Sequence, residues 1–348
     1  MSHELVDGDL SGLLEAVAEG RALSADEAES AFDRFMDGSA SEVQMAGLLM
    51  GLRTKGVEPA EVAGGVRALR KAMLPVRATN VAALVDTAGT GGGTVTTFNI
   101  STAAALVAAG AGVRVAKHGN RSFTSRCGSA DVLEALGVRI EMTPARMAEV
   151  LEEAGIVFMF APLLHPAMRH VGPVRRELGI ATIMNILGPL TNPAGALRQV
   201  IGVADAGLLD LIPGALLELG HIRALVVHGE PGMDEVSPTG MTRVAELREG
   251  EVHEYEVSPA DLGVEPAGLE ELAGGEPDQN AAIIEAVLTG EQGGARSAVV
   301  VNAAAALLVG GAADSWEEGA RLAEASIDEG SAARALERLR ASSAKDSS

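Results

Sequence analysis

The amino-acid sequence predicts an α/β protein: a small all-helical domain, and a larger domain whose mainly parallel central sheet is flanked by helices. From residue 81 onward, short runs rich in β-branched residues alternate with Ala- and Leu-rich helical patterns. Such alternation is typical of parallel strands joined by crossover helices. Residues 9–73, in contrast, repeat apolar side chains at helical spacing and contain no strand pattern, which predicts a separate group of helices.

The helices of the N-terminal group are marked by their start signals. Ser24 with Glu27 matches a capping box, and so does Ser39 with Glu42, because each residue of such a pair can accept a backbone N–H of the other. Apolar residues between 13 and 18 recur at helical spacing ahead of them. Further helices are predicted over residues 28–36, 43–53 and 59–73, followed by a connector over 75–80.

The elements of the larger domain follow from its alternating pattern. Strands are expected over 81–85, 112–116, 156–160, 199–203 and 223–228, with a hairpin over 241–257. Helices are expected between the strands over 102–110, 129–136, 144–154 and 205–219, and after the hairpin over 281–288, 298–309 and 315–339. The last residues, 341–348, are expected to be frayed.

The composition favours a soluble cytoplasmic protein with neither a membrane nor a nucleic-acid partner. A formal net charge of −21 opposes binding to a polyanion, which normally needs a basic face. The single cysteine, Cys127, excludes internal disulfides and fits a reducing compartment. No apolar run is long enough to cross a bilayer, and the acidic N-terminus does not resemble a signal peptide.

The stretch from Asp86 to Thr102 leads from a strand pattern through glycines 89, 91, 92 and 93 into a helical pattern. Glycines let backbone N–H groups approach an anion, and a helix N-terminus adds unpaired donors. Hydroxyls surround the glycines at Thr90, Thr94, Thr96, Thr97, Ser101 and Thr102. The pattern favours a phosphate-binding loop over an ordinary strand-to-helix turn. It matches neither the Walker loop, which needs a lysine, nor the dinucleotide fingerprint, which needs glycine at 94.

A second polar segment, Lys117 to Arg121, directly follows the predicted strand over 112–116. Ligands of open α/β sheets bind beyond the carboxyl ends of the strands. The positively charged or titratable side chains that could neutralise a polyanion there are Lys117, His118, Arg121 and Arg126. Nearby Asn120 and Ser125 can donate directional hydrogen bonds, and Gly128-Ser129 opens the next helix. The alternative is a surface loop with scattered positive charge.

Acidic and basic pairs elsewhere suggest a metal and a carboxylate ligand. Asp234-Glu235 follows a predicted strand, and paired carboxylates suit Mg²⁺, which also takes water and substrate phosphates as ligands; the alternative is a solvated surface pair. Arg175 or Arg176 can bind a carboxylate bidentately, or form a surface ion pair. No nucleophile–base set is apparent. Phosphate-binding groups and a metal without a nucleophile suggest displacement of a phosphate or pyrophosphate leaving group.

Taken in order, these motifs closely resemble the anthranilate phosphoribosyltransferase family over nearly the whole chain. The matching segments are 89–92, 98–102, 117–121, 128–137, 165–168, 174–179, 187–193 and 234–235. The resemblance implies transfer of the 5-phosphoribosyl group from phosphoribosyl pyrophosphate to the amine of anthranilate in tryptophan biosynthesis, with Mg²⁺ as cofactor. It also implies a homodimer formed through the helical domain. That domain would comprise 1–75 joined by the segment of about 165–190, and the α/β domain would comprise 76–164 and 191–340.

The resemblance also implies roles for individual residues. Phosphoribosyl pyrophosphate would be bound by Gly89, Thr90, Gly91, Gly92, Thr97, Asn99, Ser101, Thr102, Lys117, Asn120, Ser125 and Ser129. Anthranilate would be bound by Gly89, His118, Asn120 and Arg175, the last three also being the expected catalytic residues and Arg175 facing the carboxylate. Mg²⁺ would be bound by Ser101, Asp234 and Glu235. A glutamine amidotransferase subunit is compatible with the resemblance but is not indicated by this sequence.

The sequence departs from the family pattern at several positions. Gly93 stands where the family usually has Asp, Ala181 and Met184 replace an Arg and a Phe, and Thr124-Ser125 replaces Ser-Ser. Two alternatives follow. One is a pyrimidine nucleoside phosphorylase-like enzyme, although those chains are longer and carry an additional C-terminal domain. The other is a relative that kept the fold, lost the reaction and acts as a binding protein.

Overall fold

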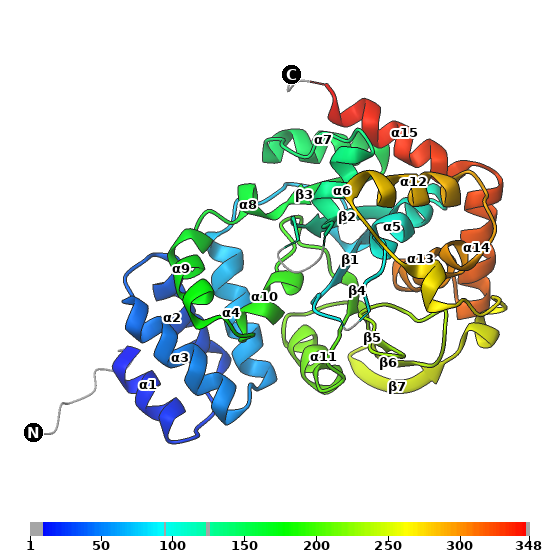
Figure 1. Cartoon of the computed structure of the whole chain (residues 1–348). Coiled ribbons are helices and arrows are strands. Elements are labelled where there is room, and N and C mark those ends of the chain that lie inside the picture. The colour runs from blue at the N-terminus through cyan, green and yellow to red at the C-terminus, as the bar shows by residue number, and fades with distance from the viewer. Residues whose placement is uncertain (1–9, 94, 123–125, 346–348) are drawn as a thin grey trace, which may run out of the picture.

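Figure 1 shows a bundle of N-terminal helices beside a larger unit built around a sheet. This computed structural model describes residues 10–93, 95–122 and 126–345. The N-terminal helices are α1 (Leu10–Ala18), α2 (Ala25–Met36), α3 (Glu42–Lys55) and α4 (Pro59–Ala72). In the described part of the chain, no helix combines the length and apolar character needed to span a membrane.

One of the two predicted capping boxes is confirmed and the other is displaced by two residues. Ser24 and Glu27 cap α2 reciprocally. The cap of α3 is Ser41, whose Oγ accepts the N–H of Gln44 at 3.3 Å while Gln44 accepts the N–H of Ser41 at 3.0 Å. The prediction of Ser39 as the cap is wrong, because its N–H donates to Asp37 at 2.8 Å in the turn that follows α2.

The larger unit is built on one seven-stranded sheet with the order β3-β2-β1-β4-β5-β6-β7. Its strands are β1 (Leu84–Gly89), β2 (Arg114–Gly119), β3 (Ile156–Phe160), β4 (Arg198–Gly202), β5 (Arg223–Gly229), β6 (Thr242–Arg248) and β7 (Glu251–Val257). The strands β1 to β5 run parallel, and the predicted hairpin, β6 and β7, adds two antiparallel strands at one edge. The predicted mainly parallel sheet is therefore confirmed.

The first strand is shifted relative to the prediction over 81–85. Val81–Ala83 form a short 3-10 helix, η1, and β1 continues through Asp86 and Thr87 to Gly89. Asp86 and Thr87 are buried in this strand. Both are polar, so they interrupt the apolar run that predicts the strand. Strand prediction by hydrophobicity misses such positions because it does not detect the hydrogen-bond partners that make their burial tolerable.

Helices cover both faces of the sheet, and adjacent residues of one strand point into different cores. Val200 of β4 belongs to the core that contains α5 (Ile100–Gly110) and α13 (Gly294–Gly310), whereas Ile201 belongs to the core of α11 (Leu208–Glu218) and the N-terminal bundle. This alternation is the two-residue period of a strand. Because α11 also packs against α4, the bundle and one face of the sheet share a continuous apolar core.

The remaining helices include a break that the sequence pattern did not reveal. They are α6 (Ser129–Ala135), α7 (Pro144–Ala154), α8 (Ala161–Leu164), α12 (Pro277–Leu288), α14 (Trp316–Asp328) and α15 (Ser331–Ser343), with 3-10 turns η2 (Pro259–Leu262) and η3 (Leu269–Leu272). The single helix predicted over 315–339 is wrong, because Gly330 has a left-handed φ of 71° that ends the helical path. The prediction of a frayed end from 341 is also wrong up to Ser343; residues 346–348 lie outside the described ones.

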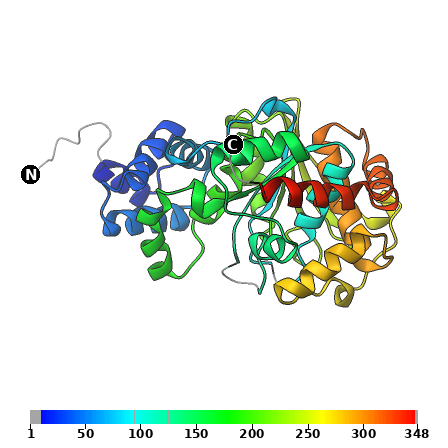
Figure 2. The same ribbon diagram turned by 90° about the horizontal axis from the view of Figure 1, so that it is seen from above.

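Between β3 and β4 the chain returns to the bundle, as Figure 1 shows in green. There α9 (Met168–Leu178) packs against α2 and α3, and α10 (Met184–Leu190) packs against α4. Arg70 of α4 donates from Nη2 to the carbonyl oxygen of Leu190 at 2.9 Å. In the view from above in Figure 2, the blue N-terminal helices and the green segment that contains α9 lie to one side of the sheet and its helices. The connection after β3 therefore belongs spatially to the bundle.

The strand order reverses at β1. The chain moves from β1 to β2 and β3 on one side, and then crosses to β4 on the other side of β1. In open α/β sheets, ligands bind beyond the carboxyl ends of the strands at such a reversal. The glycine loop follows β1 at this point, and Thr90 donates its N–H to the carbonyl oxygen of Gly202, at the end of β4, at 2.9 Å.

We predict that Ser41→Ala lowers the free energy of unfolding by about 1 kcal/mol, because the first turn of α3 loses its side-chain cap. Ser39→Ala should change it by less than about 0.5 kcal/mol, because Ser39 is an exposed turn residue that does not cap α3. Urea unfolding followed by circular dichroism measures both variants. A larger loss for Ser39→Ala than for Ser41→Ala would contradict the observed cap.

Candidate active site

The carboxylate of Asp86 lies fully buried at the centre of the site and joins three segments of the chain. It accepts the backbone N–H of His118 on β2 at 3.1 Å and Nδ2 of Asn192, which follows α10, at 2.8 Å. Nε2 of Gln199 on β4 lies 3.4 Å away. Burial raises the pKa of Asp86, and the charge of Lys117 and these hydrogen bonds oppose that rise. The carboxylate thereby fixes the carboxyl end of β2 beside β1.

Lys117 extends from β2 toward the end of β1, and only 3% of the residue is exposed. Its Nζ donates to the carbonyl oxygen of Thr87 and lies 3.2 Å from Oγ1 of Thr87 and 3.4 Å from Oγ of Ser101. Burial lowers the pKa of Lys117 to about 8, while the charge of Asp86 opposes the shift. The side chain is therefore still mostly protonated at pH 7, beside the glycine loop, where it can pair with an anionic oxygen.

The glycine loop contacts the segment that carries the acidic pair. Gly91 and Gly92 have φ values of 66° and 81°, which are left-handed conformations that favour glycine. The N–H of Gly91 donates to Oδ2 of Asp234 at 3.0 Å, and interaction with Thr97 opposes the rise in the pKa of Glu235. Because a carboxylate oxygen accepts from this backbone N–H, the loop presents a donor that suits an anionic oxygen.

Asp234 and Glu235 have the donor chemistry of a Mg²⁺ site. Burial, followed by the neighbouring charge of Asp234, raises the pKa of Glu235 well above its ordinary value. A divalent cation would relieve the repulsion between these carboxylates. Among the described residues, no cluster of three or more His, Cys, Asp or Glu side chains could hold a metal, so a cation here would need further oxygen ligands. Ser101, the third predicted ligand, contacts Lys117.

His118 forms a pair with His165, which directly follows α8. Their Nε2 atoms are 3.2 Å apart and their ring centroids 5.0 Å apart. Burial is the main cause that lowers the pKa of His118 to about 3 and that of His165 to about 4. Both rings are therefore neutral at pH 7, with one Nε2 donating and the other accepting. The expectation that His118 supplies positive charge is wrong; the pair supplies neutral, directional hydrogen bonds.

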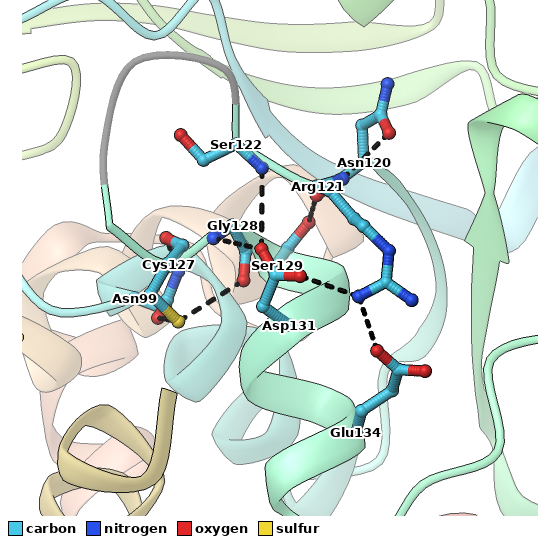
Figure 3. A network of polar contacts seen from close by, with 9 residues as sticks. All are labelled: Asn99, Asn120, Arg121, Ser122, Cys127, Gly128, Ser129, Asp131 and Glu134. Carbon is cyan, nitrogen blue, oxygen red and sulfur yellow. Dashed lines mark hydrogen bonds and ion pairs between the residues drawn. The ribbon is translucent and has the colours of Figure 1, made fainter. Parts of the chain in front are cut away.

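Figure 3 shows that Arg121 is held by acidic residues of α6. Its Nη1 donates to Oδ1 of Asp131 at 2.7 Å and also pairs with Glu134. The expectation that Arg121 neutralises a polyanion is therefore wrong, since its charge is already compensated. Asn120 accepts the N–H of Arg121 at Oδ1, 2.7 Å away, and its carbonyl oxygen lies 3.3 Å from Oγ of Ser129. The amide nitrogen of Asn120 points away from this network in Figure 3.

Two other predicted ligands of phosphoribosyl pyrophosphate have different outcomes. Ser125 lies outside the described residues. Only 1% of Thr102 is exposed, and its hydroxyl has no hydrogen-bond partner among the described residues. Thr102 lines a cavity of about 10 Å³ with Leu133 and Phe158. Lys117 lines the same cavity, so the assignment of Thr102 to phosphoribosyl pyrophosphate stays a prediction. The largely apolar pattern of α5 does not show which of its faces is outward.

Arg175 lies in the last turn of α9, on the bundle side of the site. It is half-buried, and burial lowers its pKa. Within the described residues it has neither a hydrogen bond nor an ion pair, so its planar fork is available to a carboxylate. No hydrogen bond joins it to His118 in the described part of the chain. In the connection between α9 and α10, the carbonyl oxygen of Ala181 accepts a hydrogen bond from Arg53 of α3.

Three residues of the site were missed by the sequence interpretation: His165, Asn192 and Gln199. A signal existed for His165, since it lies in the matching segment 165–168, but no role was assigned to it. Asn192 lies in the matching segment 187–193 but received no role, and no signal existed for Gln199. Asn192 and Gln199 reach Asp86 across 106 and 113 residues of sequence, and a single sequence does not encode such pairings in any local pattern.

Both parts of the chain match known families. Residues 81–333 match the family described as glycosyl transferase family, a/b domain, and residues 11–73 match its helical bundle domain. The anthranilate phosphoribosyltransferase of Rubrobacter xylanophilus is 53% identical over 327 residues, which cover 94% of this chain and 95% of that protein. The same enzyme of Azorhizobium caulinodans is 50% identical and covers 94% of each chain.

Solved structures are similar over the same extent. The crystal structure of anthranilate phosphoribosyltransferase from Thermus thermophilus has a TM-score of 0.90 and 45% identity, covering 95% of this chain and 99% of that one. The Saccharomyces cerevisiae enzyme in complex with phosphoribosyl pyrophosphate and Mg has a TM-score of 0.86 and 27% identity, covering 98% and 99%. These similarities cover both the helical bundle and the sheet.

We predict that the His118–His165 pair destabilises the folded protein at acidic pH. Because both folded-state pKa values, about 3 and about 4, lie below the unfolded value of about 6.5, the unfolded chain binds protons that the folded chain does not. Stability therefore falls as the pH falls from about 6.5 toward 4, by up to about 2 kcal/mol per histidine at pH 5. Urea unfolding at pH 7 and pH 5 measures this loss.

The comparison that isolates the pair is His165→Gln, which should lose less stability than the wild type between the two pH values. His253→Gln changes an exposed histidine and serves as the matched control, with a loss equal to that of the wild type. If His165→Gln and the wild type lose the same free energy, the pair does not remain neutral as its burial indicates.

Proposed function

Because the chain belongs to the anthranilate phosphoribosyltransferase family, we propose that the site around Asp86 carries out the family reaction through the residues assigned below. The chain is a pentosyltransferase of tryptophan biosynthesis, which transfers the 5-phosphoribosyl group from phosphoribosyl pyrophosphate to the amine of anthranilate and releases pyrophosphate. The single observation that carries the residue assignment is the placement of buried Lys117 beside the glycine loop at the strand reversal.

Phosphoribosyl pyrophosphate is assigned to the glycine loop and the end of β2. The glycine loop over residues 89–92 lies against its phosphate oxygens, the ammonium of Lys117 donates to them, and Ser101 adds a hydroxyl. The N–H of Thr90 is already used by Gly202 and that of Gly91 by Asp234. Asn99 and Asn120 supply amides at the same edge. Two contacts among these segments support this assignment: Lys117 and Ser101 approach each other, and the N–H of Gly91 donates to a carboxylate.

Anthranilate is assigned to His118, Asn120 and Arg175. The amine of anthranilate is neutral at pH 7, so positioning contributes more than removal of a proton before attack. Cleavage of the bond to pyrophosphate builds positive charge on the ribose, and the neutral His118–His165 pair adds no repulsion to it. Arg175 binds the carboxylate when the bundle and the sheet close on the substrates.

Asp234 and Glu235 would hold Mg²⁺, with Ser101 nearby. When bound, the ion supplies positive charge that stabilises the departing pyrophosphate. The yeast relative binds phosphoribosyl pyrophosphate together with Mg, which supports this assignment. The chain's own contribution is to hold two carboxylates next to the glycine loop, where the N–H of Gly91 reaches Asp234.

Further proposals concern the setting of the enzyme. We propose a cytoplasmic homodimer that associates through the helical domain, comprising 1–75 and the segment of about 165–190, with 76–164 and 191–340 as the α/β domain. The packing of α9 and α10 on the bundle helices supports this division. The named relatives are phosphoribosyltransferases, which favours this reaction over a pyrimidine nucleoside phosphorylase.

The decisive experiment follows anthranilate fluorescence after addition of phosphoribosyl pyrophosphate during a Mg²⁺ titration. We expect a loss of fluorescence that requires both phosphoribosyl pyrophosphate and Mg²⁺. Folded protein that consumes no anthranilate at any Mg²⁺ concentration would instead indicate a binding protein. Consumption of thymidine or uridine with phosphate would indicate the phosphorylase.

We predict that Arg175→Ala raises the KM for anthranilate about 10- to 100-fold and leaves the KM for phosphoribosyl pyrophosphate within about twofold, because it removes a charge-assisted contact to the carboxylate. Arg176→Ala, which alters an exposed neighbour on the same helix, is the matched control and should change neither value. Steady-state kinetics with each substrate varied in turn distinguishes them. An effect confined to phosphoribosyl pyrophosphate would reassign Arg175.

We predict that Gly93→Asp changes the Mg²⁺ dependence and keeps the activity. A Cβ at position 93 would lie 3.6 Å from Oδ1 of Asp234 and 3.1 Å from the carbonyl oxygen of Gly232, so the new carboxylate would add negative charge beside the acidic pair. Half-maximal activity should then require less Mg²⁺. Gly93→Asn has the same shape without the charge and should retain the wild-type profile; an unchanged profile for Gly93→Asp refutes the prediction.

A further inference from the structure

Asn99 is the N-cap residue of α5, yet its side chain does not cap the helix. Asparagine at this position normally accepts a backbone N–H of the first turn. Here Oδ1 of Asn99 instead lies 2.9 Å from Nδ2 of Asn280 on α12 and 3.2 Å from Sγ of Cys127, while its Nδ2 donates to the carbonyl oxygen of Cys127 at 3.1 Å. The carbonyl end of this amide is therefore fully used inside the protein.

The orientation of Asn280 is fixed by the backbone. Only 1% of Asn280 is exposed, and its Oδ1 accepts the N–H of Gly275 at 2.7 Å. An amide whose oxygen faces a backbone donor must turn its nitrogen the other way, toward Asn99. Asn99 must in turn present its oxygen to Asn280. The backbone N–H of Gly275 thus sets the orientation of the amide of Asn280 and, through it, that of Asn99.

Neighbouring contacts fix the position of the segment that carries Asn99. The N–H of Phe98 donates to the carbonyl oxygen of Leu272 at 2.9 Å, and Thr97 forms a β-bridge with Ala273. Burial raises the pKa of Cys127 to about 11, so its thiol stays protonated. The sulfur is closer to Oδ1 of Asn99 than to the carbonyl oxygen of Gly128, at 3.2 Å against 3.6 Å. Figure 3 shows Asn99 beside Cys127.

We propose that Asn280 is a positioning residue for the phosphoribosyl pyrophosphate site: it orients the amide of Asn99 so that the ligand meets an N–H donor and not a carbonyl oxygen. Asn99 donates one of its two Nδ2 hydrogens to Cys127 and has a second to offer. A phosphate or pyrophosphate oxygen accepts hydrogen bonds only, so a reversed amide would repel it. This inference rests on the proposed function, which places Asn99 on that substrate.

The test compares variants of Asn280 in the full-length enzyme by steady-state kinetics with each substrate varied separately. Asn280→Asp keeps the size and the acceptor for Gly275 but replaces the donor to Asn99 with an oxygen. We expect its KM for phosphoribosyl pyrophosphate to rise at least about tenfold, and that of Asn280→Ala somewhat less, with the KM for anthranilate within about twofold of wild type.

A structural control and a rescue pair accompany these variants. Ser326→Ala removes a buried hydrogen bond, 2.9 Å long, to the carbonyl oxygen of Val107 near the opposite end of α5, so it should lower the melting temperature without changing either KM. Cys127→Ala removes the second donor to Asn99 and should raise the KM for phosphoribosyl pyrophosphate a few-fold. Cys127→Ser retains a donor to Asn99 and should return the KM for phosphoribosyl pyrophosphate to the wild-type value. This pair of variants keeps the proposal testable if the Asn280 variants fail to fold.

The outcomes separate the inference from the function on which it rests. A wild-type enzyme that transfers the phosphoribosyl group, with wild-type KM values in both Asn280 variants, overturns the positioning role alone. A parallel rise of both KM values, or the same rise in Ser326→Ala, also overturns it, because a general loss of structure would explain the change. A folded wild-type protein without transfer overturns the proposed function and the inference together.

Discussion

The buried carboxylate of Asp86 is the interaction on which the geometry of the site depends. A carboxylate removed from water is costly unless its lone pairs are satisfied. Here the N–H of His118, the amide of Asn192 and the nearby amide of Gln199 satisfy it, and the charge of Lys117 opposes its neutralisation. Because these partners come from different segments, the carboxylate can be satisfied only when all of them are in place.

The same arrangement determines where the two sides of the site meet. Asn192 follows α10, which packs on the bundle helix α4, and it also donates to the carbonyl oxygen of Ala116 on β2 at 2.8 Å. Arg70 of α4 caps the other side of the same connection at Leu190. The bundle, which carries Arg175 through α9, is thus anchored at the strand that presents Lys117 and His118.

Burial also determines the protonation states that suit the reaction. The histidine pair is kept neutral and Lys117 is kept mostly charged, although all three are largely removed from solvent. The difference arises mainly because the ordinary pKa of lysine, 10.5, lies well above that of histidine, 6.5, so that burial lowers the pKa of only the histidines below neutrality; the charge of Asp86 also opposes the shift of Lys117. The end of β2 therefore combines one mostly charged side chain with a neutral pair of rings.

The sequence by itself determined the fold class, the alternation of strands and helices, the glycine loop and the segment at Lys117, because these are local patterns of period, turn chemistry and residue type. It misplaced the cap of α3, the start of β1 and the break at Gly330, where one or two residues of backbone conformation decide the outcome. Only the tertiary structure decided that Thr102 faces the interior, that Arg121 is neutralised by α6, and that His118 has His165 as its partner. Those properties depend on burial and on contacts between distant segments, which no local pattern contains.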